Sequence, residues 1–424
     1  MIELHDPRAL DLSRWIGPGD TLVCSQIHAE PVTLMRLLAQ QRAQLGPVSV
    51  FVGPLVAETF TPAHGDHIGL RSYCGTGRNA ALADAGMLDP VPTHYSEYAR
   101  LYADGLVPCD VVLLGVTEAD ADGRFNLGPC NDYTVDAARR ARVVIAEVLP
   151  GLPWVRGAEL PSDIAPQVLL RANAPASLLP ETGPGSAEEQ AIARHVASIV
   201  PDRATLALGI GAMPNLVLRA LAGHRGLGIH SGAIGDAMVE LVQAGVITNE
   251  GKPEFQGVSV GNLLMGSRRL LDFADRNPQL RLEPTRFTHD ITSMRRIPRF
   301  YAASSCVEMD LSGQVNAEVA GGRYIGAVGG QGDFLRGANL SPGGGSVMML
   351  SSTARGGRSS RIVARLADAV VTTPRSDVQW VVTEHGVADL RGKSLRQRMQ
   401  ALLPLAHPAF REALEREARR SAAP

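Results

Sequence analysis

Short apolar runs alternate with longer stretches of helical spacing along most of the chain. Segments 19–26, 48–55, 110–116 and 141–149 are rich in β-branched and other apolar residues and are bounded by turn residues, which predicts buried strands. Segment 31–45 instead has apolar residues at helical spacing. Such strand–helix–strand alternation predicts a mostly parallel sheet covered by helices on both faces.

The pattern weakens over residues 151–188, where Pro, Gly and Ser are frequent, and this segment is the predicted linker. We therefore predict two open, mostly parallel α/β domains, residues 1–182 and 183–424, with the active site between them. The second series of elements comprises predicted helices at 187–200 and 214–223, strands at 205–211, 226–232, 301–310, 346–352, 361–366 and 369–374, and a helical tail after residue 390.

Composition narrows the possible partners of the protein. The chain has 424 residues, and its 41 basic and 43 acidic side chains give a net charge of −2, so a nucleic-acid partner is not expected. No apolar stretch approaches the roughly 18 residues that span a bilayer, and no signal peptide is visible. The five cysteines are an odd number without a CxxC pair, which disfavours a disulfide framework or a metal cluster. The sequence predicts a cytoplasmic protein without a membrane partner or a metal.

Three glycine-rich segments are candidates for ligand contacts. Residues 208–215 place two glycines between a predicted strand and a helix, which suits an anion but equally suits a tight turn without ligand. Of the 21 residues in 326–346, eight are Gly, and the polar residues between them disfavour a disordered linker. Residues 351–363 add hydroxyls and three arginines, which fit a phosphate or carboxylate or, alternatively, a solvated basic loop.

Together these segments resemble the acetyl-CoA hydrolase/transferase family of family I CoA-transferases, especially the 4-hydroxybutyrate and butyryl CoA-transferases. The likeness runs through the chain in order. It comprises HAEP (28–31), EADADGRFNLG (118–128), VVIAEV (143–148), LGIGAMPN (208–215), LGIH (227–230), DLSGQVNAE (310–318), GAVGGQGDFLRGA (326–338), SSTARGGRSSRIV (351–363), VVTEHGVADLRGKSL (381–395) and AHPAFREAL (406–414).

The resemblance implies an activity and a set of ligand contacts. It implies ping-pong transfer of CoA from a short acyl-CoA to a small carboxylate such as acetate, butyrate, 4-hydroxybutyrate or itaconate, through a covalent glutamyl-CoA intermediate. Coenzyme A thioester is then a substrate, no cofactor is permanently bound, and a homodimer or homotetramer is expected. The implied CoA contacts are Gly209, Ile210, Gly211, Ala212, Met213, Gly329, Gly330 and Thr353, with the amides of Gly329 and Gly330 as possible oxyanion donors.

The chain departs from the family pattern at the nucleophile. The family strand LGIH continues with a small hydroxyl residue and the nucleophilic Glu, whereas here Ser231 is followed by Gly232. In the first hypothesis, a carboxylate from the N-terminal half replaces it, Glu58 ahead of Glu30, and enters the room that the missing side chain leaves. In the second, the protein hydrolyses acyl-CoA with a carboxylate, His28 or His230 as base. In the third, it is a non-catalytic CoA-binding paralogue.

Two further groups of charged residues are weaker candidates for ligand binding. The alternating acids of residues 118–123 are similar to a calcium loop but lack its closing Glu, so we expect a structural turn. Arginines at 336, 355, 358 and 361 could contact CoA phosphates or a carboxylate, and the sequence does not rank them.

Overall fold

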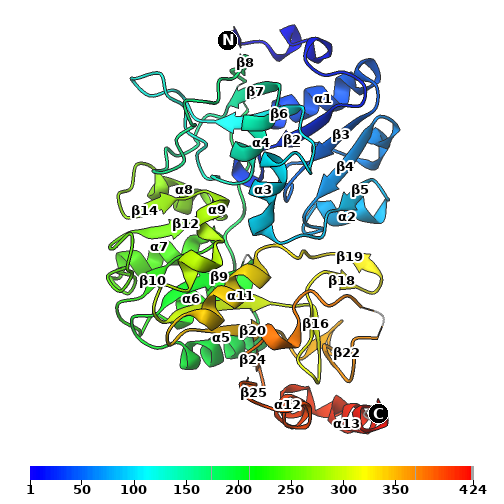
Figure 1. Cartoon of the computed structure of the whole chain (residues 1–424), viewed down its shortest axis with the longest axis vertical. Helices are drawn as coiled ribbons and strands as arrows, with labels where there is room; N and C mark the ends of the chain where they lie inside the picture. The colour runs from blue at the N-terminus through cyan, green and yellow to red at the C-terminus, as the bar shows by residue number, and fades with distance from the viewer. Residues whose placement is uncertain (173, 210, 368, 422–424) are drawn as a thin grey trace. The chain divides into compact units, whose positions relative to one another are not determined.

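The computed structural model describes residues 1–172, 174–209, 211–367 and 369–421. The chain forms two compact units (Figure 1). The division differs from the predicted continuous domains, because two segments of the later half fold with the N-terminal part. Unit 1 comprises Met1–Pro180, Val260–Thr288 and Arg323–Gly329, and unit 2 comprises Glu181–Ser259, His289–Gly322 and Gly330–Pro424.

Hydrogen bonds to residues 129–154 explain why residues 260–288 belong to unit 1. The Asn262 side chain donates to the carbonyl of Asn131 at 2.5 Å, and the backbone N–H of Leu264 donates to that of Pro129 at 2.9 Å. Further along, the N–H of Arg276 donates to the carbonyl of Trp154 at 2.8 Å. Buried backbone groups need such partners, so this segment completes the first unit.

The core of unit 1 is an eight-stranded parallel sheet in the order β1-β8-β7-β6-β2-β3-β4-β5. All six residues of β6 and of β7 are buried, as expected for a parallel sheet covered on both faces. The strands are β1 (Ile2–Leu4), β2 (Thr21–Cys24), β3 (Val48–Phe51), β4 (Ile68–Ser72), β5 (Leu88–Pro90), β6 (Val111–Val116), β7 (Val143–Val148) and β8 (Val168–Leu170).

The two faces of this sheet carry different cores. Because successive strand residues point to opposite faces, Val50 joins an aliphatic cluster with leucines of α1, whereas Phe51 joins an aromatic cluster. Five of the chain's seven tyrosines surround Phe51 or one another, with ring centroids 5–7 Å apart. The helices of unit 1 are α1 (Val32–Leu45), α2 (Asn79–Asp84), α3 (Tyr98–Ala103), α4 (Thr134–Arg140), α8 (Arg268–Ala274) and α9 (Thr285–Thr288).

Unit 2 contains a six-stranded sheet in the order β10-β9-β15-β20-β24-β25. Its pairs are parallel except β24 with β25, which form an antiparallel edge. The strands are β9 (Thr205–Leu208), β10 (Gly228–Ile229), β15 (Phe300–Ser305), β20 (Gly345–Met349), β24 (Trp380–Thr383) and β25 (Gly386–Asp389).

Helices α5, α6 and α11 contact this sheet (Figure 1), and α10 packs against α11. Helix α5 begins at a capping box, in which Ser186 and Glu189 satisfy each other's backbone amides. The helices are α5 (Ala187–Ile199), α6 (Ala212–Ala220), α7 (Asp236–Gln243), α10 (Ile291–Met294), α11 (Gln331–Leu340), α12 (Leu395–Leu402) and α13 (Pro408–Ser421). The short strands are β11 (Ala233–Ile234), β12 (Ser259–Gly261), β13 (Leu263–Leu264), β14 (Leu280–Leu282), β16 (Glu308–Asp310), β17 (Val315–Asn316), β18 (Val319–Ala320), β19 (Arg323–Tyr324), β21 (Thr353–Ala354), β22 (Ser359–Ser360) and β23 (Ile362–Val363).

The predicted fold class, α/β with mostly parallel sheets, is confirmed. Two predicted strands need correction. Residues 301–310 form two strands, β15 and β16, and residues 369–374 form none. Val370 and Val371 in that segment are 42% and 44% exposed, so these apolar side chains are not buried in a sheet. Within the described residues, no helix is both long and apolar enough to cross a membrane.

Candidate functional site

The strand order of unit 1 reverses between β2 and β6. Strands β3, β4 and β5 lie on one side of β2, and β6, β7 and β8 lie on the other. Ligands of open α/β sheets bind at the carboxyl ends of strands beside such a reversal. Residues 25–30, which include Glu30, follow β2 directly, and Glu58 lies beyond the end of β3.

The segment after β2 is held in a strained conformation. Ile27 is fully buried and has φ of 56°, in the left-handed region that β-branched residues avoid. Its neighbour Gln26 accepts a hydrogen bond from the Tyr73 hydroxyl at 2.7 Å and donates to the carboxylate of buried Asp132. Burial raises the pKa of Asp132. Strain of this kind costs about 1–3 kcal/mol and persists only where surrounding contacts impose it.

The Glu30 carboxylate is fully buried and fixes the loop that leads to Glu58. It accepts hydrogen bonds from the backbone N–H of Val56 at 2.6 Å and of Ala57 at 2.9 Å. Burial raises the pKa of Glu30 to about 7, although these two hydrogen bonds and the charge of Arg78 act in the opposite direction. Glu30 is therefore placed to hold a backbone rather than to meet a solvent-borne substrate.

Glu58 differs from Glu30 in every respect that matters for reaction. Its side chain is 72% exposed, and Oε2 lies 3.5 Å from Nη1 of Arg78. The same arginine donates through Nε to the carbonyl of Val56 at 2.8 Å. The structure thus presents Glu58 as an accessible carboxylate beside a guanidinium, on a loop fixed by Glu30 from within.

The two histidines that were considered as bases are both buried. His28 accepts a hydrogen bond at Nε2 from the backbone N–H of Gly266 at 3.3 Å, so its Nδ1 donates to the carbonyl of Ser177 at 2.6 Å. Both ring nitrogens of His28 therefore bind backbone groups. The ring of His230 packs edge-on against Phe300 with centroids 5.9 Å apart.

In unit 2 the strand order reverses between β9 and β15. The glycine turn predicted to contact CoA follows β9 at this reversal, and the N–H of Gly209 donates to the carbonyl of Ala303 at 3.2 Å. Gly211, which caps the start of α6, has φ of 107°, a conformation that side-chain-bearing residues rarely adopt. A Cβ on Gly209 or Gly211 would meet no atom within 4 Å, so the turn borders open space. Ile210, also predicted to contact CoA, lies outside the described residues.

The remaining predicted contacts of this turn are accessible. Gly211 and Ala212 are exposed and Met213 is half-buried, at the first turn of a nine-residue helix. Backbone N–H groups at such a helix start favour a phosphate or another anion.

The second loop at the same sheet edge, residues 230–235, joins β10 to α7 and contains Gly232. A Cβ on Gly232 would lie 2.9 Å from Nε2 of His289 and 3.0 Å from Cε2 of Phe334. We expected the missing side chain at Gly232 to leave room for an incoming carboxylate. That expectation is wrong for the space that a side chain at 232 would occupy. The imidazole of His289 fills that space.

Gly330 borders the same imidazole. It caps the start of α11, and a Cβ there would lie 2.8 Å from both Cδ2 and Nε2 of His289. Gly329 has φ of 52°, and its carbonyl accepts a hydrogen bond from the N–H of Tyr95 at 2.9 Å. Thr353 lies in β21, which pairs with β22, and is half-buried.

Among the four arginines that the sequence left unranked, Arg336 is already paired, because its Nε donates to Asp377 at 2.7 Å. Arg355 and Arg358 are exposed at the β21–β22 connection. In the acidic turn, Asp120 accepts hydrogen bonds from the N–H of Asp122 and of Arg124 at 3.0 and 2.9 Å, which gives it a structural role. Within the described residues, no group of three acidic, His or Cys side chains could hold a metal.

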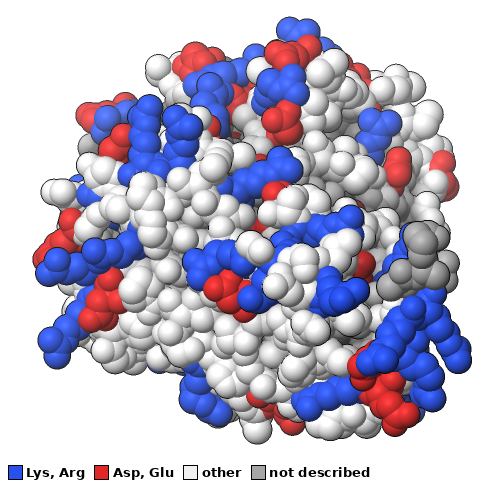
Figure 2. Space-filling view, turned by 60° about the horizontal axis from the view of Figure 1, so that its bottom comes forward, with Lys and Arg blue, Asp and Glu red and all other residues white. Residues whose placement is uncertain are grey.

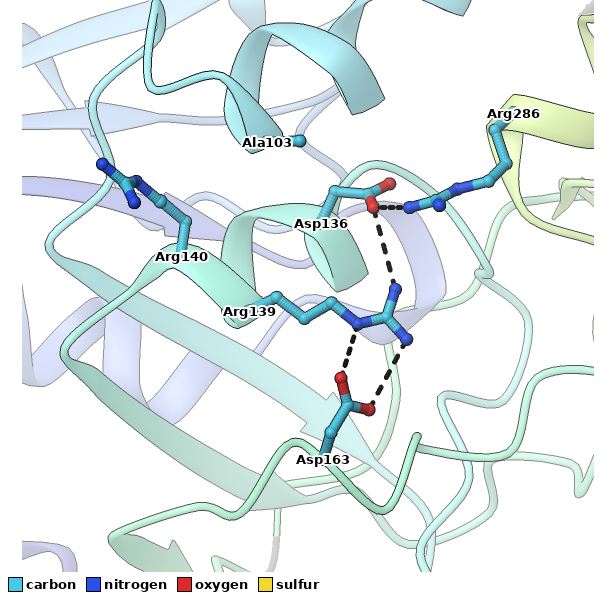
Figure 3. A pocket seen from close by; sticks show the side chains of 6 residues that line it. All are labelled: Ala103, Asp136, Arg139, Arg140, Asp163 and Arg286. Carbon is cyan, nitrogen blue, oxygen red and sulfur yellow. Dashed lines mark hydrogen bonds and ion pairs between the residues drawn. The ribbon is translucent and has the colours of Figure 1, made fainter.

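Sequence reasoning missed a pocket of about 610 Å³ in unit 1 (Figure 3). Arg139 pairs with Asp163 at 2.8 Å, and both Arg139 and Arg286 point to Asp136. These carboxylates already neutralise the two arginines, and the pocket contains none of the predicted site residues. On the face shown in Figure 2, basic and acidic side chains are likewise interspersed.

Comparison with known proteins decides the family. The sequence model of the acetyl-CoA hydrolase/transferase N-terminal domain matches residues 19–167, and that of the C-terminal domain matches residues 266–418. The chain belongs to the acetyl-CoA hydrolase/transferase family. Glu30 and Glu58 lie in the first match and His289 and Gly330 in the second.

Relatives and solved structures of this family cover most of the chain. The 4-hydroxybutyrate coenzyme A transferase of Clostridium kluyveri is 42% identical over 79% of this chain and 78% of its own length. The butyryl-CoA:acetate CoA-transferase of Anaerostipes caccae is 31% identical over 96% and 94%. The crystal structure of RipA from Yersinia pestis is 31% identical, covers 99% of this chain and 97% of its own, and superposes with a TM-score of 0.91. Family and relatives indicate CoA-transferase activity.

Proposed function

We propose that the protein is a CoA-transferase that moves CoA between a short acyl-CoA and a small carboxylate, with Glu58 as its nucleophile. The observation that carries this assignment is the contrast between the two predicted carboxylates. Glu58 is 72% exposed beside Arg78. Glu30 is buried, and its carboxylate accepts hydrogen bonds from the backbone amides of Val56 and Ala57. Acetate, butyrate, 4-hydroxybutyrate and itaconate are the candidate acceptors.

The proposed reaction is a double exchange at one carboxylate. An oxygen of Glu58 attacks the thioester carbonyl carbon, the carbon–sulfur bond breaks, and a mixed anhydride forms with release of CoA thiolate. The thiolate then attacks the Glu58 carbonyl of the anhydride, which releases the donor carboxylate and leaves a glutamyl-CoA thioester. An acceptor carboxylate reverses the two steps and leaves as the new acyl-CoA.

Other groups support binding rather than bond exchange. The backbone amides of Gly211, Ala212 and Met213, at the start of α6, are available to a phosphate of CoA. Arg78 is placed to balance the charge of Glu58 when a second carboxylate approaches. We also expect a homodimer or homotetramer, which light scattering after size-exclusion chromatography would detect.

Product analysis tests the function. The protein is incubated with butyryl-CoA and isotopically labelled acetate, and thioesters are identified by mass spectrometry. Transfer predicts labelled acetyl-CoA formed in step with butyrate and no accumulation of free CoA. Free CoA without labelled acetyl-CoA would instead establish hydrolysis. Binding of CoA without either product would establish a binding protein.

A further inference from the structure

Arg78 connects the ends of two neighbouring strands of the unit 1 sheet. It follows β4 and directly precedes α2, and β4 pairs with β3. Its Nε donates to the carbonyl of Val56 at 2.8 Å, and its Nη1 lies 3.5 Å from Oε2 of Glu58, both in the loop after β3. The side chains of Arg78 and Glu58 are 51% and 72% exposed. The guanidinium is therefore accessible, although one edge of it is anchored to the backbone.

The backbone around this guanidinium is fixed by the next residue, Asn79. Its side chain is fully buried, and Nδ2 donates to the carbonyls of Gly53 at 3.0 Å and of Cys74 at 3.1 Å. Its Oδ1 accepts a hydrogen bond from the N–H of Leu55 at 3.2 Å. One buried amide thus ties the loop after β3 to the loop after β4. A ligand that binds Arg78 therefore does not have to order this backbone first.

The polar contacts of Arg78 leave donors for a ligand. Nε is occupied by the carbonyl of Val56. At 3.5 Å, the contact of Nη1 with Glu58 is an ion pair longer than the roughly 2.7–2.9 Å of a charge-assisted hydrogen bond. These two are the only hydrogen bond and ion pair of Arg78 among the described residues, so the N–H groups of Nη1 and Nη2 have no hydrogen-bond acceptor there. A guanidinium binds a carboxylate bidentately through two such groups.

We propose that Arg78 is the binding group for the substrate carboxylate and that it holds one carboxylate at a time, that of Glu58 in the resting protein and that of the acceptor once Glu58 carries CoA. The inference rests on the proposed function for the reaction and for Glu58 as the nucleophile. It deepens that function because it names the residue that recognises the acceptor and the chemical class that this residue selects, a small carboxylate anion.

The charge balance of the reaction explains the alternation. When Glu58 becomes a glutamyl-CoA thioester, its negative charge leaves with the donor carboxylate, and Arg78 loses its partner charge. The acceptor carboxylate supplies a new one, and its oxygen attacks the thioester carbon of Glu58 while the carbon–sulfur bond breaks. The CoA thiolate then attacks the acceptor carbonyl of the anhydride, the carbon–oxygen bond to Glu58 breaks, and the charge returns to Glu58. No proton is exchanged. Because water is uncharged, it gains less from the guanidinium than a carboxylate does.

The alternation is tested by titrating butyrate into wild type and into Glu58→Gln, with saturation-transfer NMR as the readout. The amide of the variant is neutral, as the thioester is, and leaves Arg78 without its partner charge. Glu58→Gln should bind butyrate about five- to tenfold more tightly than wild type, because a like charge is removed and a charge-assisted hydrogen bond becomes available. Neutral butyramide should bind both proteins alike. Equal butyrate affinity, or no measurable binding of butyrate to Glu58→Gln, would overturn the proposal.

Variants of Arg78 show whether this residue is responsible. In the Glu58→Gln background, Arg78→Gln should abolish the gain in butyrate affinity. Arg78→Lys, which keeps the charge but not the planar fork, should keep part of the gain. Glu118→Gln removes an exposed glutamate beside Arg171 and is the matched control, which should bind butyrate as wild type does. A gain that persists after Arg78→Gln would overturn the assignment to Arg78.

A kinetic measurement distinguishes carboxylate binding from a merely structural role of Arg78. Arg78→Lys should lower kcat/KM for acetate about tenfold and change kcat/KM for butyryl-CoA by less than about threefold. The difference is expected because Arg78 already has a carboxylate partner, Glu58, before butyryl-CoA reacts, whereas it has none before acetate binds. Equal losses in both parameters would contradict the alternation.

The outcomes separate this inference from the proposed function. The butyrate titration needs no turnover, so a gain in Glu58→Gln that depends on Arg78 would support the carboxylate site even if the product analysis finds no transfer. If labelled acetyl-CoA forms but Glu58→Gln gains no affinity for butyrate, the proposed function stands and the role of Arg78 is wrong.

Discussion

The two sheets of this protein present different chemistry at equivalent places. Both reverse their strand order once, between β2 and β6 in unit 1 and between β9 and β15 in unit 2. The edge of unit 1 carries two glutamates, one buried and one exposed, whereas the edge of unit 2 carries glycine turns around the buried imidazole of His289. The same topology thus supplies a carboxylate on one sheet and backbone donors on the other.

The contrast between the glutamates shows how burial assigns roles. Glu30 gives its oxygens to two backbone amides, and Glu58, one residue beyond them, keeps its oxygens accessible. A nucleophile needs free lone pairs at a fixed position. In this loop the buried carboxylate of Glu30 holds the backbone, and the exposed carboxylate of Glu58 meets the requirement of the proposed nucleophile.

The largest expected effect is at Glu58. Glu58→Gln should reduce CoA transfer on the order of 10³-fold or more, because an amide cannot form the anhydride. The melting temperature should stay unchanged, since the side chain is exposed. Initial rates of acetyl-CoA formation measure the loss. Glu118→Gln, an exposed glutamate paired with Arg171, is the matched control and should keep its activity.

The buried carboxyl group of Glu30 should make the free energy of unfolding depend on pH. Its pKa is about 7 in the folded protein against 4.5 in the unfolded chain, so between these values the folded state binds more protons. Its contribution is therefore present below pH 4.5 and is lost as the pH rises through 7. From pH 5 to pH 8 the free energy of unfolding of wild type relative to Glu30→Gln should fall by about 2–3 kcal/mol. Urea unfolding at both pH values measures it, and a constant difference would contradict the buried environment.

The glycine turn of unit 2 should give a smaller effect on ligand affinity. Gly211→Ala should weaken CoA binding about tenfold, because alanine at φ of 107° strains the turn by 1–3 kcal/mol. Gly209→Ala has no such backbone demand and should weaken binding less. Calorimetric titration with CoA compares them, and equal losses would show that the turn's conformation is irrelevant.

The pocket in Figure 3 should give the smallest effect. Arg139→Ala removes an ion pair between side chains that are 40% and 58% exposed, which contributes about 0–1 kcal/mol at most to stability. CoA affinity and transfer rate should remain as in wild type. A tenfold loss of affinity would instead place a ligand in this pocket.

Much of the fold could be predicted because buried parallel strands have a distinctive sequence. The segments around β2, β3, β6 and β7 are continuous apolar runs, and each became a strand. The apolar run at 369–374 shares that composition, yet its Val370 and Val371 lie exposed, since hydrophobicity alone cannot reveal whether a sheet edge is available. The transfer of residues 260–288 to unit 1 depends on hydrogen bonds to residues more than a hundred positions away.

The candidate site was predictable only in part. Turn glycines and glutamates after strands could be found by spacing, but the burial of Glu30 depends on how the loop of Val56 and Ala57 folds over it. His289 belongs to no periodic pattern or motif in the sequence. Its ring contacts the backbones of two glycines that lie 57 and 41 residues away along the chain (289 − 232 and 330 − 289).

Intact-protein mass spectrometry after incubation with butyryl-CoA shows whether Glu58 carries CoA during the reaction. We expect a covalent adduct that adds the mass of CoA less one water, located by peptide mapping at Glu58, removed by added acetate, absent from Glu58→Gln and present in Glu118→Gln. An adduct on Glu30 or another residue, or labelled acetyl-CoA formed without any adduct, would contradict it.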